Sequence, residues 1–86
     1  MKVTKRNGNV VLYDDEKIIR SILKASTAAS EAVSEKTAAY IAGEVFARLS
    51  AAEDIFSTED VRQCVYRALC DKGYAQTAKI YMEYRK

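Results

Sequence analysis

The stretch that decides the fold covers residues 3–18 and reads VTKRNGNVVLYDDEKI. Its Asn-Gly pair at positions 7–8 is the strongest short-range signal for a tight β-hairpin turn, and the residues on both sides of the pair favour strands. Asp14 follows at a position typical of a helix N-cap, and two further acidic residues fill the first turn, where negative charge suits the helix dipole. The stretch therefore predicts a two-stranded ribbon that leads directly into a helix.

The rest of the chain predicts an α+β fold, in which a unit of four helices is capped by a ribbon of two or three strands. Ile55-Phe56 predicts a short third strand, because a lone hairpin is marginally stable. We expect the caps of the later helices at Ser34 and at Ser57 or Thr58, and a stop at Gly73. The expected helices cover residues 15–27, 34–50, 58–72 and 74–85, with a frayed helix end and loop at 26–34.

Apolar residues recur on one face of each expected helix, which predicts the core. These residues are Ile18, Ile19, Ile22 and Leu23, then Ala38, Ile41, Ala42, Val45, Phe46 and Leu49, then Val61, Cys64, Val65, Ala68 and Leu69, and finally Ala78, Tyr81 and Met82.

The composition predicts one soluble domain over residues 1–86 and excludes several classes of protein. The net charge of +2 is too small to indicate a nucleic-acid or membrane binder by itself. We expect a cytoplasmic protein, because no apolar run spans a bilayer and no signal peptide opens the chain. The chain has no histidine, and its two cysteines, Cys64 and Cys70, point in different directions on one helix, so we expect neither a disulfide between them nor a shared metal.

The opening stretch also resembles the start of an ATP-cone domain, a small nucleotide-binding module found at the N-terminus of many ribonucleotide reductases. The resemblance rests on the Val-Thr-Lys-Arg-Asn-Gly run at 3–8 and on Tyr13-Asp14 followed by Glu-Lys-Ile at 16–18. It continues through 57–61 to the Tyr-Met-Glu-Tyr-Arg segment at 81–85, and Asn7 stands where the family commonly has aspartate. Reductase-gene repressors of this family carry a zinc ribbon before the cone, whose four cysteines this sequence lacks.

If they converge, Lys5, Arg6 and Lys17 could bind a polyphosphate together with the free amides of a helix start. The residues alone also allow Lys5 and Arg6 to be a pair of solvated charges at the end of a strand. Arginine grips phosphate with two bonds, whereas lysine acts as a point charge. Asp14 is either only the helix cap or also a group that holds a magnesium-bound water or orients Lys17. Tyr13 or Tyr81 could lie near the base. The resemblance implies a nucleotide site formed by Val3, Lys5, Arg6, Lys17 and Thr58, and we add Asp14 to the candidate nucleotide-binding residues.

No phosphate-binding glycine loop and no nucleophile paired with a base occurs in the sequence, so we expect nucleotide binding without turnover. The resemblance implies an allosteric sensor of ATP or dATP, with Mg²⁺ carried on the nucleotide. It also implies a reductase catalytic domain or another cone domain as partner, either in the same protein or in trans. The alternatives are a small DNA-binding regulator that uses the basic ribbon, which the low net charge disfavours, and a purely structural interaction module.

Overall fold

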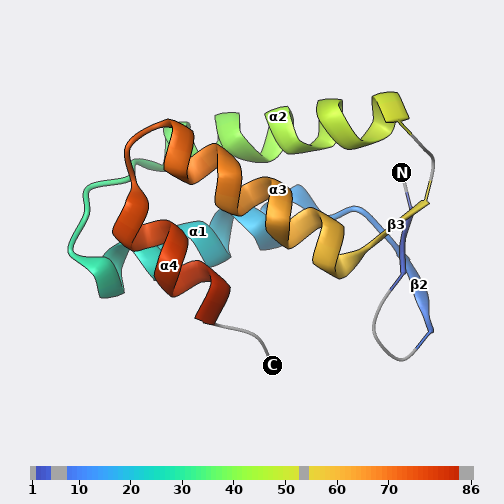
Figure 1. Ribbon diagram of the computed structural model, residues 1–86, viewed down its shortest axis with the longest axis horizontal. Helices are drawn as coiled ribbons and strands as arrows, with labels where there is room; N and C mark the ends of the chain where they lie inside the picture. The colour runs from blue at the N-terminus through green and yellow to red at the C-terminus, as the bar shows by residue number, and fades with distance from the viewer. Residues whose placement is uncertain (1, 5–7, 53–54, 84–86) are drawn as a thin grey trace.

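The computed structural model describes residues 2–4, 8–52 and 55–83, which form four helices and three short strands (Figure 1). The predicted α+β architecture is confirmed, including the third strand. In chain order the elements are β1 (Lys2–Thr4), β2 (Val10–Leu12), α1 (Asp15–Ala29), α2 (Glu35–Ala52), β3 (Ile55–Ser57), α3 (Thr58–Asp71) and α4 (Ala75–Glu83).

The middle strand of the sheet is β1, which pairs antiparallel with β2 and parallel with β3. Val3 lies opposite Val11 in one neighbour and opposite Phe56 in the other, so these three side chains share one face of the sheet. Val3 belongs to the core formed with the helices, and we call this face the inner face. Figure 1 shows the sheet at one end of the helical unit.

The four helices form a closed bundle in which each packs against two neighbours, in the order α1, α2, α3, α4 and back to α1. This arrangement follows from one apolar stripe per helix, because every stripe must be buried against other elements. The fully buried side chains include Ile22 of α1, Ile41 and Val45 of α2, and Leu69 of α3. The core therefore lies along the bundle axis, and the sheet closes one end of it.

Helix ends are set by side chains close in sequence, as predicted. Ser34 accepts the Thr37 N–H at 3.1 Å and begins α2. Ser57 and Asp60 form a capping box at the start of α3, so Ser57 and not Thr58 is the cap. Gly73, with φ of +89°, ends α3, and the N–H groups of residues 73 and 74 donate to the carbonyls of residues 70 and 69 in the pattern of a Schellman motif.

A carboxylate distant in sequence completes the start of α4. Glu31, in the connection between α1 and α2, accepts the Thr77 N–H at 2.8 Å and the Thr77 hydroxyl at 2.6 Å. These bonds lower the pKa of Glu31, because both donors stabilise its ionised form. Thr77 is fully buried, so its hydroxyl has no access to water as a replacement partner.

Two details differ from the sequence prediction. Helix α1 continues to Ala29 and stops at Ser30, which adopts the left-handed conformation with φ of +56°. The core assignment of Phe46 is wrong, since 42% of this residue is exposed. Phe46 is at the rim of the apolar stripe of α2, where its ring packs against Tyr13 with 5.3 Å between the ring centroids.

Candidate functional site

The register of the sheet places its inner face between the starts of two helices. Helix α1 follows β2 and begins near the end of the sheet where Leu12 pairs with Lys2. β3 runs directly into α3 at the opposite end, where Ser57 pairs with Thr4. Helix starts carry unpaired N–H groups and a partial positive charge, so the two ends favour anions.

Asp14 and Lys17 define the start of α1. Asp14 Oδ1 accepts the backbone N–H of Lys17 at 3.3 Å, which confirms that Asp14 is the N-cap. Both side chains are exposed, so the Lys17 ammonium is accessible to a ligand. Capping satisfies only one of the four amides that an α-helix leaves without partners at its start, and the others stay available.

Val3 and Thr58 occupy the sheet and the start of α3. Val3 is buried, whereas its inner-face neighbour Val11 is 39% exposed. The packing of the inner face is therefore incomplete beside Val3, and an apolar surface faces solvent there. Thr58 is the first residue of α3 and is half-buried. Lys5, Arg6 and Asn7 lie outside the described residues.

The two tyrosines that the sequence analysis named as candidates near the base are packed in or against the core. The Tyr13 hydroxyl donates to the Ala42 carbonyl at 2.8 Å and joins the start of α1 to the middle of α2. Burial raises the pKa of Tyr13 well above its ordinary value, and it raises the pKa of Tyr81 to about 12. Both hydroxyls are therefore neutral near pH 7, and that of Tyr13 is already donating within the fold.

Arg62 is a residue of this region that the sequence analysis missed. It lies one turn after Thr58 on α3, and its Nη2 donates to the Met82 carbonyl at 2.9 Å. Its Nε is buried and has no hydrogen-bond partner among the described residues. The spacing of four residues from Thr58 could have identified it, because residues four apart share a helix face.

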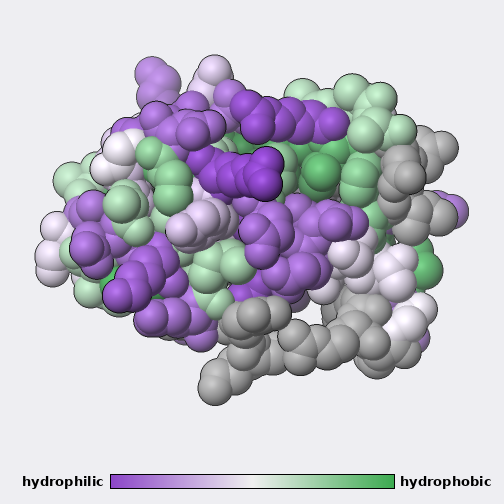
Figure 2. All heavy atoms as spheres, viewed as in Figure 1, coloured by the Kyte–Doolittle hydropathy of each residue, from purple (hydrophilic) through white to green (hydrophobic). Residues whose placement is uncertain are grey.

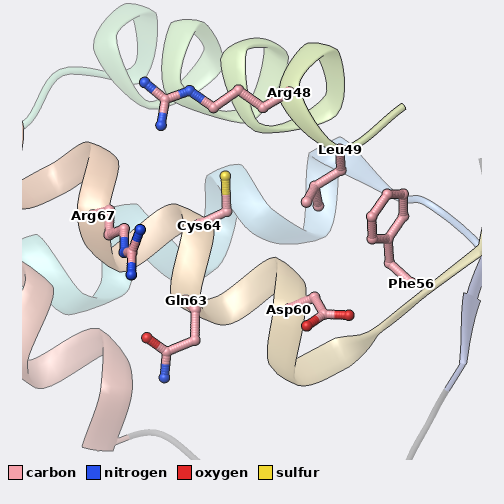
Figure 3. A pocket seen from close by; sticks show the side chains of 7 residues that line it. All are labelled: Arg48, Leu49, Phe56, Asp60, Gln63, Cys64 and Arg67. Carbon is pink, nitrogen blue, oxygen red and sulfur yellow. The ribbon is translucent and has the colours of Figure 1, made fainter. Parts of the chain in front are cut away.

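A separate hollow of about 410 Å³ lies between α2 and α3 and contains none of the predicted site residues (Figure 3). Figure 3 shows Leu49 and Phe56 at its sheet end, and the Cys64 sulfur directed towards α2. Burial raises the pKa of the Cys64 thiol, with Arg48 and Arg67 acting in the opposite direction. Figure 2 shows hydrophilic side chains over much of this side of the molecule.

The described residues offer no cluster of three side chains of the types that hold a metal ion. Cys64 and Cys70 are both free thiols, Cys64 half-buried and Cys70 exposed. Among the helices described, none combines the length and the apolar character needed to cross a membrane.

The fold and this region define the class of the protein as a small α+β domain with helix starts at opposite ends of a three-stranded sheet. The family model for the ATP cone domain matches residues 1–86, and the chain therefore belongs to the ATP cone family. A search of curated proteins found no match. Membership means that the chain is a nucleotide-binding, allosteric regulatory domain, a type of domain without catalytic activity of its own.

Proposed function

We propose that this chain senses ATP and dATP and controls the activity of a ribonucleotide reductase, either as the N-terminal module of the reductase or as a separate cone acting in trans. The observation that carries the proposal is the match to the ATP cone family over the whole chain. The proposed nucleotide-binding residues are Val3, Lys5, Arg6, Asp14, Lys17 and Thr58.

In this proposal the phosphates contact the cations Lys5, Arg6 and Lys17. Lys17 contributes its exposed ammonium beside the amides of α1. Lys5 and Arg6 follow Thr4 in the sequence, and Thr4 pairs with Ser57, the residue that caps α3. A triphosphate carries about four negative charges, and each cation within about 4 Å contributes on the order of 1–4 kcal/mol, depending on exposure.

The nucleoside binds against the apolar surface beside Val3. Val11 exposes 39% of its area on the same face, and a purine covering it would bury this area. Thr58 presents its hydroxyl from the start of α3, one residue beyond the capping Ser57. This division assigns charged groups to the phosphates and apolar groups to the base, as is usual for small-molecule sites.

The biological setting proposed is the cytoplasm, where the nucleotide carries Mg²⁺. The partner is a reductase catalytic domain or a second cone domain. ATP permits activity and dATP inhibits it by changing how cone domains associate.

Thermal unfolding with and without nucleotide tests the proposal. With a dissociation constant taken as about 10 μM, millimolar ATP stabilises the domain by about 2.7 kcal/mol. That raises Tm by roughly 10–20 °C for a domain of this size. We expect a similar or larger rise with dATP, a small rise with GTP, and no release of ADP. Unchanged Tm with both adenine nucleotides and magnesium contradicts the proposal, and equal rises with every triphosphate reduce the site to an unspecific polyphosphate site.

A matched pair of variants then locates the site. Lys17→Ala removes an exposed lysine from the first turn of α1, and Lys36→Ala removes an exposed lysine from the first turn of α2. We expect the first change to weaken ATP binding 10-fold or more, through loss of one charge-assisted contact worth roughly 1.5–3 kcal/mol. The second change should leave the affinity unaltered. Equal affinities for both variants would place the phosphates elsewhere.

A further inference from the structure

Helix α4 returns alongside α3, and Arg62 joins the last turn of α4 to the first half of α3. Its Nη2 donates to the carbonyl of Met82, the penultimate residue of α4 as described. The last four carbonyls of a helix have no hydrogen-bond partner within it, so Arg62 provides a donor for one of them. The cation also lies at the negative end of the helix dipole. Arg62 therefore caps a neighbouring helix.

The guanidinium uses only part of its binding capacity in this contact. Nε and Nη2 lie on the same edge of the guanidinium plane and together form the fork that grips two oxygens of a carboxylate or phosphate. The Met82 carbonyl provides one oxygen and occupies Nη2. Nε has no partner among residues 2–4, 8–52 and 55–83, although it is buried. The fork is therefore half occupied.

Arg62 is also within reach of the start of α3. It lies four residues after Thr58, about one helical turn or roughly 5.4 Å along the axis. Side chains on a helix lean towards its N-terminus, so the natural direction of this long side chain is towards Thr58. An arginine there can serve either the end of α4 or an anion bound at the start of α3.

We propose that Arg62 couples the nucleotide site to α4, because a bound phosphate group fills both nitrogens of the fork and draws the guanidinium away from the Met82 carbonyl. The inference rests on the proposed function, since it requires phosphate at the start of α3. The last turn of α4 loses its external cap when nucleotide binds. The end of α4 is then the part of the domain whose stability depends on whether the nucleotide site is occupied.

Hydrogen–deuterium exchange of the native protein with and without ATP tests the coupling. We expect ATP to slow exchange in the first turn of α3 and to speed exchange several-fold at the amides of residues 80–83. Protection of α3 with unchanged exchange at the end of α4 overturns the coupling and leaves the proposed function intact. A native protein that binds no adenine nucleotide overturns the proposed function and the coupling together.

The variant Arg62→Lys keeps the charge and removes the fork, and Arg67→Lys makes the same change at the hollow on another side of α3. We expect Arg62→Lys to exchange rapidly at residues 80–83 even without ATP, to show no further increase with ATP, and to bind ATP about 10-fold more weakly. Arg67→Lys should behave as the native protein. Identical behaviour of the two variants overturns the proposal.

Discussion

Replacing Thr77 by valine removes one buried hydroxyl and leaves the size of the side chain almost unchanged. The hydroxyl donates to Glu31 Oε1 at 2.6 Å, and Thr77 is fully buried. A hydrogen bond to a charged acceptor contributes about 2 kcal/mol, and each kcal/mol corresponds to about 4–8 °C in a domain of this size. Thr77→Val should therefore lower Tm by about 8–16 °C at pH 7.

The matched control is Thr27→Val, because the exposed Thr27 hydroxyl donates to the Leu23 carbonyl of its own helix, at 3.1 Å. We expect it to change the free energy of unfolding by less than about 0.5 kcal/mol. Circular dichroism during heating measures both variants. Equal Tm values for the two variants would refute the assignment of Glu31 as the external cap of α4.

The same pair predicts a pH dependence. Glu31 has a folded-state pKa below the ordinary value of 4.5, because Thr77 donates to it. Its carboxylate therefore stabilises the fold fully above pH 4.5, and this contribution is lost as the pH falls below 4.5 through the folded-state pKa. The Tm difference between the native protein and Thr77→Val should shrink over that interval. A difference that stays constant from pH 7 to pH 3 would contradict the ionised pairing.

Three further measurements follow from the fold. Ser57→Ala should destabilise the protein by about 1 kcal/mol through loss of the capping box, whereas Ser50→Ala, at an exposed site near the end of α2, should have little effect in the same denaturant titration. Tyr81→Phe should remove an ionisation step near pH 12 from an absorbance titration, and a step lost near pH 10 instead would show that burial does not raise the pKa of Tyr81. Iodoacetamide at pH 8 should alkylate the exposed Cys70 before Cys64, whose pKa is raised by burial. Mass spectrometry of the peptides measures the order, and earlier alkylation of Cys64 would contradict this prediction.

Local signals in the sequence were sufficient for most of the architecture. The antiparallel pairing of β1 with β2 joins residues six to ten positions apart, and the caps at Asp14 and Ser34 and the stop at Gly73 depend on residues within about four positions of one another. The end of α1 was misjudged because Ser30 takes a left-handed conformation that glycine would have signalled. The end of a helix can be predicted from local sequence when glycine, the usual residue in the left-handed conformation, stands there, and Ser30 gives no such signal.

Contacts between residues far apart in the chain could not be predicted from the sequence. Neither the capping of α4 by Glu31 nor the bond from Arg62 to Met82 leaves a periodic pattern, because each joins two helices or a helix and a loop. Of the candidate site, the capping role of Asp14 could be predicted from local chemistry. The exposure of Val11 beside buried Val3 could not, because it depends on how the sheet sits on the bundle.

The central position of β1 has a consequence for how the protein acquires its structure. During synthesis Val3 emerges about 50 residues before Phe56, its parallel partner, and at about 5–20 residues per second this interval lasts several seconds. Only the β2 half of the sheet can form in that time, and an isolated hairpin is marginally stable. Closing the sheet therefore waits for α1 and α2 to be made, and the pairing of β1 with β3 carries a large loop-closure cost. We expect substitutions at Phe56 to speed unfolding more than they slow folding, which would mark the sheet as the last part of the domain to assemble.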